Sequence, residues 1–159
     1  MPNILGLDPA TKCGYSASDG LYGTLTLPGP EYARGPDLLA LYEFITHLSA
    51  DWPLDLIGYE AAAWGSKNFN TAAGHNRLSG VIELAAATLK VPCLAVNPTS
   101  LKTFATGNPQ AGKQQMIEAA RTILKFPSLE SDECDARWVR EYVANRLKIG
   151  RLTGAIGRA

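Results

Sequence analysis

Four acidic residues of this chain stand where carboxylates are able to do chemistry. Asp8 and Glu60 each end a short apolar run that predicts a buried strand, and open α/β sheets place their sites at the carboxyl ends of strands. Asp132 and Asp135 lie three residues apart, so they share one face in the first turn of a predicted helix, where the dipole favours negative charge. Taken singly, each acid has a structural alternative, such as a turn residue, a helix cap or a surface ion pair.

The four acids carry more information as a group. Four carboxylates in one place repel one another, and their pKa values rise unless cations neutralise them. Carboxylate oxygens suit hard divalent ions such as Mg²⁺ or Mn²⁺. Two such ions about 4 Å apart can activate water and stabilise the leaving oxygen in phosphodiester hydrolysis. Two divalent ions would also balance four negative charges, so the acids predict a two-metal hydrolytic site.

The apolar pattern predicts five strands and five helices that position these acids. We expect strands at 4–7 (ending at Asp8), 13–17, 22–27, 54–60 and 91–96, and helices at 36–50, 69–90, 98–105, 111–125 and 132–147. The polar turn Ser18–Gly20 predicts a hairpin between the second and third strands. This order indicates an α/β fold with a mixed five-stranded sheet flanked by helices on both faces. The hairpin start and the lack of a GxGxxG sequence after the first strand argue against a plain doubly wound dinucleotide-binding fold, and there is no P-loop sequence.

Length and composition limit the class of protein. A chain of 159 residues with 46% hydrophobic and 19% charged residues is typical of one folded domain rather than a disordered chain. It has neither an apolar run of about 20 residues nor a basic leader, which favours a bacterial cytoplasm or a phage-infected cell. The three cysteines form no CxxC pair and fit free thiols. We place the domain at 1–147 and expect 148–159 to be a basic, flexible tail.

Positive charge is concentrated in the C-terminal part of the chain. Residues 1–100 hold five basic and nine acidic groups, a net charge of −4, whereas residues 101–159 hold ten basic and six acidic groups, a net charge of +4. Such segregation permits a positive face toward phosphates, although an uneven solvated surface explains it equally well. Charge alone does not decide between the two.

Five segments, in order along the chain, resemble RuvC-type Holliday junction resolvases of the ribonuclease H-like superfamily. They are Gly6–Tyr15, Ile57–Glu60, His75–Val81, Asn97–Lys102 followed by Ala111–Lys113, and Asp132–Ala136 with the pattern D-x-x-D-A. The resemblance runs from residue 4 to about residue 145. It implies a homodimeric, metal-dependent endonuclease of DNA recombination and repair that acts on branched DNA, chiefly four-way junctions. It further implies paired cuts that leave 5′-phosphate and 3′-hydroxyl ends.

The resemblance also implies roles for single residues. Asp8, Glu60, Asp132 and Asp135 would hold two Mg²⁺ or Mn²⁺ ions per site. Lys102 and Lys113 would lie near the scissile phosphate, because a lysine presents a compact charge to such a group. Two solvated helix lysines are the structural alternative.

DNA contacts are expected from those two lysines and from residues around the second acid. These residues are Trp64, Lys67, Asn68 and Arg77. Trp64 would stack on an unpaired base, a contact worth about 1–3 kcal/mol, although the aromatic of the family corresponds here to Ala63. A core or dimer-interface role is the alternative for this tryptophan. The two histidines, His47 and His75, match no ligand position and are interpreted as structural residues.

Two other functions stay open. A flap or branch nuclease, or an RNA-processing nuclease of the same fold, would use the same acids, because specificity resides in loops and dimer geometry. A junction-binding module without catalysis would not need an intact acidic site, and the four retained carboxylates disfavour it. Ala10 departs from the family pattern, which often has glycine after the first aspartate.

Overall fold

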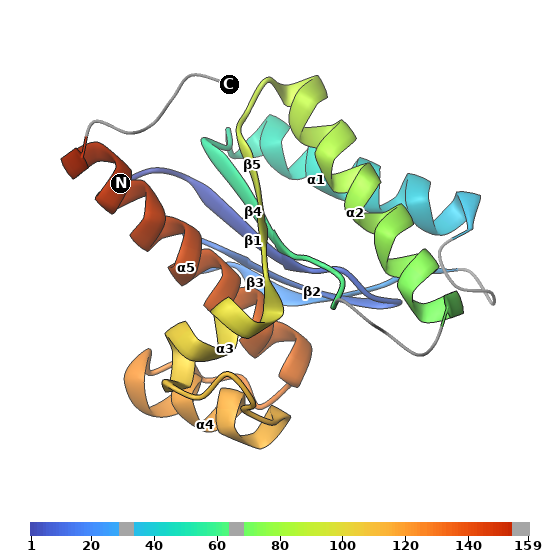
Figure 1. The fold of residues 1–159 in the computed structure, drawn as a ribbon. Helices are drawn as coiled ribbons and strands as arrows, with labels where there is room; N and C mark the ends of the chain where they lie inside the picture. The colour runs from blue at the N-terminus through green and yellow to red at the C-terminus, as the bar shows by residue number, and fades with distance from the viewer. Residues whose placement is uncertain (29–33, 64–68, 154–159) are drawn as a thin grey trace.

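The structure is a computed structural model that describes residues 1–28, 34–63 and 69–153 (Figure 1). All five strands and five helices expected from the apolar pattern are present, with ends that differ by a few residues. In chain order they are β1 (Ile4–Asp8), β2 (Lys12–Ala17), β3 (Tyr22–Thr26), α1 (Gly35–Asp51), β4 (Leu56–Glu60), α2 (Phe69–Leu89), β5 (Cys93–Val96), α3 (Pro98–Thr106), α4 (Lys113–Ile123) and α5 (Ser131–Thr153).

The strands form one mixed sheet in the order β3-β2-β1-β4-β5. β1 pairs antiparallel with β2 and parallel with β4, and β4 pairs parallel with β5. The hairpin between β2 and β3 turns at Gly20, whose φ of +100° suits glycine. Asp19 accepts a hydrogen bond from the Leu21 amide within this turn (2.9 Å). The predicted α/β class and the mixed five-stranded sheet are therefore confirmed.

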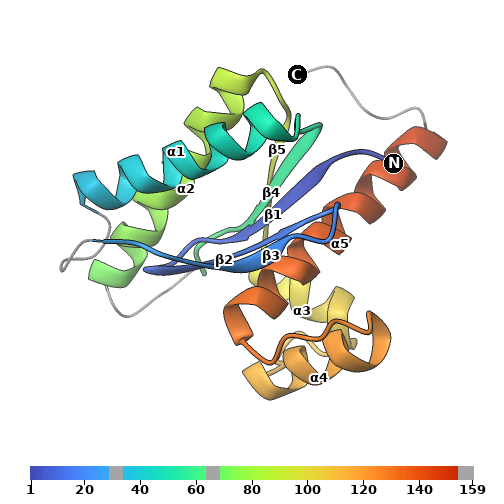
Figure 2. The ribbon, with the colours of Figure 1, turned by 180° about the vertical axis from the view of Figure 1, so that it is seen from behind.

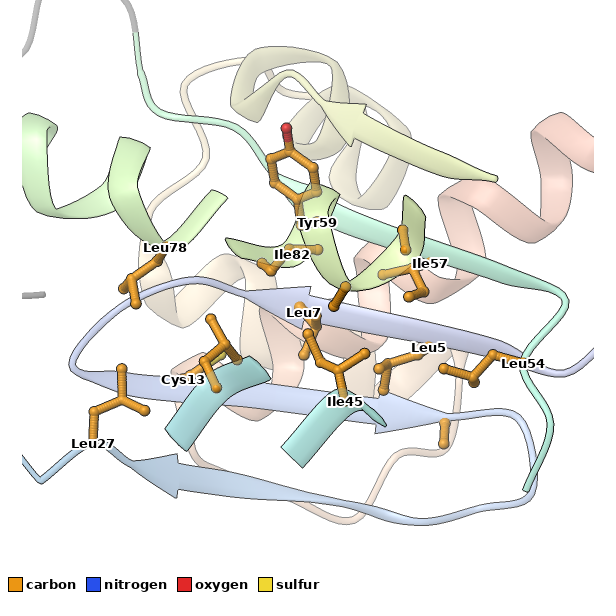
Figure 3. Packing of buried hydrophobic residues seen from close by; sticks show 14 residues of the cluster. Leu5, Leu7, Cys13, Leu27, Ile45, Leu54, Ile57, Tyr59, Leu78 and Ile82 are labelled. Carbon is orange, nitrogen blue, oxygen red and sulfur yellow. The ribbon is translucent and has the colours of Figure 1, made fainter. Parts of the chain in front are cut away.

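Helices cover both faces of the sheet. Figures 1 and 2 show α1 and α2 together on one face, and α5 with α3 and α4 on the other. Large side chains from the sheet and from the α1–α2 layer fill the first core, among them Leu5, Leu7, Ile45, Leu78 and Ile82 (Figure 3). A second core joins the opposite face to α3, α4 and α5. Burial of apolar surface on both faces explains why the central strands are almost entirely apolar.

α5 approaches the sheet at three strand glycines. A Cβ atom built on Gly6 or Gly14 would collide with the main chain of α5, at Ala136 and Asp132 respectively. A Cβ atom on Gly58 would lie 2.7 Å from a methyl carbon of Val143. At Gly6 and Gly14 the backbone of the helix therefore packs directly on the backbone of the strands, which fixes its height above the sheet there.

α5 also corrects one expectation about the chain end. The helix expected to end at 147 continues to Thr153, and the flexible tail stays a prediction. Good helix formers in this stretch, such as Lys148 and Arg151, outweigh the cost of about 1 kcal/mol of one internal glycine, Gly150. Residues 154–159 lie outside the described residues, and the domain boundary stays a prediction.

Two further sequence-based expectations concern cysteines and membranes. Cys13, Cys93 and Cys134 are free thiols, as their spacing predicted. Within the described ranges, none of the helices combines the length and apolar character that a membrane span requires.

Candidate active site

The first two acids meet at one edge of the sheet because β1 and β4 are parallel neighbours. Asp8 is the last residue of β1, and Glu60 is the last residue of β4. The register pairs Leu7 with Tyr59, so the two strands end level with each other. Both acids are half-buried. This is the edge at which open α/β sheets build their sites.

The other two acids reach the same edge through the start of α5. The main chain of Asp132 lies against Gly14, and Gly14 is the partner of Asp8 in the β1–β2 register. Asp135 is on the same helix face, one turn further along. Acids more than seventy positions apart in sequence thus meet because a glycine lets the helix start next to Asp8.

The pKa values show that the four acids share one electrostatic environment. Burial raises the pKa of Asp8 well above its ordinary value, and the charges of Glu60, Asp135 and Asp132 raise it further. Burial, followed by the charge of Asp135, raises the pKa of Glu60 to about 7. Burial and the charge of Asp132 raise the pKa of Asp135 to about 6. Asp8, Glu60 and Asp135 therefore resist ionisation in this environment.

Two lysines oppose these shifts. Lys113 lowers the pKa values of Asp8 and Asp135, and Lys102 lowers those of Glu60 and Asp135. The structure thus brings all six residues predicted from the sequence to one place. The two lysines provide only two positive charges beside four acidic groups.

Each lysine is positioned by the start of its own helix. Asn97 caps α3 by accepting hydrogen bonds from the amides of Thr99 (2.9 Å) and Ser100 (3.3 Å), which orients the turn that carries Lys102. Lys113 is the first residue of α4.

Trp138 of α5 contacts both of these helices. The indole of Trp138 donates a hydrogen bond to the Met116 carbonyl of α4 (3.2 Å). Its ring also packs edge-on against Phe104 of α3, with 6.0 Å between ring centroids. The helix that carries Asp132 and Asp135 therefore also fixes the helices that carry the lysines.

Glu133, which follows Asp132 on α5, makes different contacts. Glu133 accepts hydrogen bonds from the hydroxyls of Thr24 (3.2 Å) and Ser128. Its charge is not among those that shift the pKa values of Asp8, Glu60 or Asp135. Of the adjacent pair Asp132 and Glu133, only the aspartate belongs to the acid cluster.

The donor set of the cluster fits hard divalent cations. Its oxygens are carboxylate oxygens, and the pKa values are raised by burial first and by neighbouring negative charge second, both of which a cation would offset. In the described part of the chain, no group of three or more His, Cys, Asp or Glu side chains is already arranged to hold a metal ion. Binding would therefore require rotation of carboxylate side chains that now repel one another.

Of the four residues predicted to contact DNA in addition to the lysines, the structure describes one, Arg77. Arg77 is exposed on α2 and is not among the charges that shift the pKa values of the acids. Trp64, Lys67 and Asn68 lie outside the described residues. The contacts of these four residues with DNA stay predictions.

One residue next to the acids was missed from the sequence. The imidazole Nε2 of His75, on α2, lies 2.8 Å from the main-chain carbonyl oxygen of Glu60. Burial lowers the pKa of His75, so the ring is neutral at pH 7. The partner of His75 is a main-chain carbonyl fifteen positions earlier in the chain, and such a contact leaves no local pattern in the sequence. Only the pairing of the strands, which leaves the Glu60 carbonyl without a partner in the sheet, could have pointed to it.

Comparison with known proteins gives a family match over most of the chain. The family model described as crossover junction endodeoxyribonuclease RuvC matches residues 4–140. The crossover junction endodeoxyribonuclease RuvC of Rhodococcus opacus is 32% identical over 143 residues, which cover 84% of this chain and 76% of the relative. That of Nocardia farcinica is 32% identical over 130 residues, or 76% of this chain and 68% of the relative.

Solved structures show the same fold at lower identity. The structure of T. thermophilus RuvC in complex with Holliday junction substrate superposes with a TM-score of 0.80 at 17% identity, covering 94% of this chain and 97% of that one. The yeast mitochondrial Holliday junction resolvase Ydc2 gives a TM-score of 0.56 at 12% identity, covering 92% and 83%. These likenesses confirm the ribonuclease H-like architecture.

Proposed function

Since this chain belongs to the RuvC family of crossover junction endodeoxyribonucleases, we propose that it resolves four-way DNA junctions by hydrolysing one phosphodiester bond in each of two opposite strands. One observation carries the proposal: four carboxylates from β1, β4 and α5 gather at one sheet edge with two lysines beside them. Carboxylates gathered in this way repel one another and destabilise the fold, and such clusters are typical of functional sites.

In this proposal Asp8, Glu60, Asp132 and Asp135 hold two divalent cations, Mg²⁺ or Mn²⁺. When bound, such ions supply a nucleophilic water at neutral pH and stabilise charge on the leaving oxygen, which leaves 5′-phosphate and 3′-hydroxyl ends. With pKa values of about 7 and about 6, the carboxyls of Glu60 and Asp135 hold protons part of the time near neutral pH. Those protons leave the carboxyl oxygens when the site is loaded, so metal affinity should increase with pH.

The lysines bind the substrate phosphate. Lys113 lies in the first turn of α4, where the helix dipole favours an anion. Lys102 approaches the acids from α3. Two cations on separate helices can hold a non-bridging phosphate oxygen and balance charge that develops during attack. Trp64, Lys67, Asn68 and Arg77 are proposed to contact DNA further from the scissile bond.

A homodimer would match the symmetry of a four-way junction. Two identical sites related by a two-fold axis can cut opposite strands symmetrically. α2 offers a surface for this association, because Gly80, Leu84 and Ala87 are exposed on one side of it, with Leu84 59% exposed. Small residues beside an exposed leucine allow close helix packing.

The test is strand-resolved cleavage of a synthetic immobile four-way junction, with a linear duplex, a flap and a single-stranded RNA as control substrates. The reactions are run with Mg²⁺, with Mn²⁺ and with EDTA, for the wild-type chain and for Asp8→Asn. We expect paired, symmetric nicks on the junction that need a divalent ion. In Asp8→Asn they should fall by about two to three orders of magnitude, because the variant loses a ligand of the cations that stabilise the transition state.

The other outcomes separate the alternatives. Equal cutting of junction and flap would leave the site in place but make the enzyme a general branch nuclease. Preferred cutting of RNA would assign it to RNA processing. Binding of the junction without cutting in either metal would contradict the catalytic proposal and leave a binding module.

A further inference from the structure

The backbone of the strand that carries Glu60 has a gap in its hydrogen-bond ladder. The amides of Ile57 and Ala61 donate to β5, at the carbonyls of Pro92 (3.0 Å) and Val96 (2.8 Å). Backbone groups of successive residues point to opposite sides of a strand. The carbonyl of Glu60 therefore points the other way, toward β1.

On β1, the residue that should donate to this carbonyl is a proline. The Ile4 carbonyl accepts from Ser18 beside β2 (3.1 Å), so the backbone groups of Leu5, Leu7 and Pro9 point toward β4. The register pairs Leu7 with Tyr59, so its continuation by one pair sets Asp8 opposite Glu60. In a parallel ladder, the amide that donates to the Glu60 carbonyl would then be that of the residue after Asp8, which is Pro9. Proline has no amide hydrogen. The carbonyl of the second acid thus has no donor in the sheet.

His75 occupies the place of this missing donor. Its Nε2 lies 2.8 Å from the Glu60 carbonyl oxygen, and since a carbonyl can only accept, the imidazole must carry its proton on Nε2. The Ser79 hydroxyl donates to the main-chain carbonyl of His75 (2.9 Å), one turn along α2. A side chain of α2 therefore completes the ladder at the residue whose carboxylate joins the acid cluster.

We propose that His75 is a positioning residue: its Nε2–H fixes the carboxyl end of β4 and thereby the direction of the Glu60 carboxylate. The inference rests on the proposed function, because it presumes that Glu60 holds a divalent cation. Glu60 is the last residue of β4, with β5 on one side and only the end of β1 on the other. Without His75, the peptide unit after Glu60 is held, among the described residues, only by the bond from the Ala61 amide to Val96, so its carbonyl can tilt about that bond and the Glu60 side chain changes direction with it.

The test compares three variants of His75 that differ in whether their side chain can donate a hydrogen bond to the Glu60 carbonyl. His75→Ala removes the donor, His75→Gln places an amide nitrogen near the position of Nε2, and His75→Asn carries the same amide on a side chain one carbon shorter. Outer contacts that orient metal ligands typically contribute about 10–100-fold to metal affinity or activity. We expect kcat on the junction to fall at least about tenfold in His75→Ala and His75→Asn, and to recover largely in His75→Gln.

A second measurement does not depend on cleavage. Mn²⁺ alone, without DNA, should raise the melting temperature of the wild-type protein, because it binds only the folded state. His75→Ala and His75→Asn should need about tenfold more Mn²⁺ for the same rise, and His75→Gln about the wild-type concentration. Junction affinity in EDTA should stay within about twofold for all variants, since the phosphate contacts are elsewhere.

Ser79→Ala is the matched control, because it removes a hydrogen bond of the same helix without touching Glu60. Equal losses in Ser79→Ala and His75→Ala would overturn the proposal, as would equal activity and Mn²⁺ response of His75→Gln and His75→Asn. If His75→Ala does not fold, the comparison of His75→Gln with His75→Asn still tests whether a donor at the position of Nε2 is needed. If the wild type cuts no junction, the proposed function fails, and the Mn²⁺ titration still tests the role of His75.

Discussion

On the face covered by α1 and α2, the space between helices and strands is filled by large side chains such as Leu41, Ile45 and Ile82. On the opposite face, α5 touches the strands where they carry glycine, at Gly6 and Gly14. A side-chain interface can repack when one residue changes, because neighbours adjust their rotamers. A backbone interface has no such freedom. The acids of α5 are thus positioned by the less tolerant of the two interfaces.

The largest effect on the packing of α5 against the sheet is expected from Gly14→Ala. The added methyl group meets the main chain of Asp132, so α5 must move away from Asp8. Overpacking of this kind costs about 1–3 kcal/mol of stability, and a displacement of about 1 Å at a reacting group can cost about 100-fold in rate. Cleavage rates and thermal unfolding of the variant measure both effects.

Gly35→Ala is the control for this substitution. Outside its own helix backbone and its chain neighbours, a Cβ atom on Gly35 of α1 meets no atom of the described residues within 4 Å, so stability and cleavage should stay unchanged or improve slightly. A Gly14→Ala protein that cuts at the wild-type rate would show that the acids tolerate movement of α5.

The second prediction concerns the cost of burying the Glu60 carboxylate beside another acid. Glu60 has a pKa of about 7 in the folded protein against 4.5 ordinarily, so the folded state binds this proton more tightly than the unfolded state does. Its contribution to stability is therefore present below pH 4.5 and is lost as the pH rises through 7. Glu60→Gln removes this dependence. In EDTA, the variant should exceed the wild type by about 1–3 kcal/mol at pH 8 and match it at pH 4.

Urea unfolding at the two pH values measures this difference. A variant that is less stable than the wild type at pH 8 would contradict the repulsion inferred at the sheet edge. The same substitution should abolish metal-dependent cleavage, so stability and activity change in opposite directions.

A smaller effect is expected on the α1–α2 face. Ile82→Val removes one buried methyl group from the side-chain core and should lower stability by about 0.5–1.5 kcal/mol. Because α2 can adjust around the smaller side chain, kcat should not change. Parallel denaturation and cleavage assays test this, and a tenfold loss of kcat would remove the distinction between the two faces.

The smallest effect is expected from Ser16→Ala. Ser16 lies on β2 opposite Gly6, and among the described residues its buried hydroxyl has no hydrogen-bond partner. Removing an unsatisfied hydroxyl while keeping the backbone contact should be neutral or stabilise by up to about 1 kcal/mol. A loss of more than about 1 kcal/mol in thermal unfolding would reveal a partner for this hydroxyl, such as an ordered water.

The elements of this fold could be predicted from the sequence because their signals are local. Alternating and helical apolar patterns define the strands and helices, and Ser18–Gly20 marks the hairpin. The end of α5 was less predictable, since Gly150 and the basic residues around it indicated a tail, whereas helix propensity carries the helix to Thr153.

The candidate site was predictable as a set of residues because each acid lies at a recognisable place, a strand end or a first helical turn. Its geometry was not. The glycines beneath α5 look like ordinary strand interruptions in the sequence, and their purpose emerges only when the helix lies against them. The same holds for Glu133, which is adjacent to Asp132 in sequence but hydrogen-bonded to Thr24 and Ser128 in space.

By itself, then, the sequence determined the order of the elements, the mixed sheet and which carboxylates and lysines could act together. The tertiary structure decided how closely α5 approaches the strands, which of two neighbouring acids joins the cluster, and that His75 supplies the donor that Pro9 lacks. The physical reason is that periodicity and propensity act over a few residues, whereas backbone contact and hydrogen-bond completion join atoms that are distant in the chain.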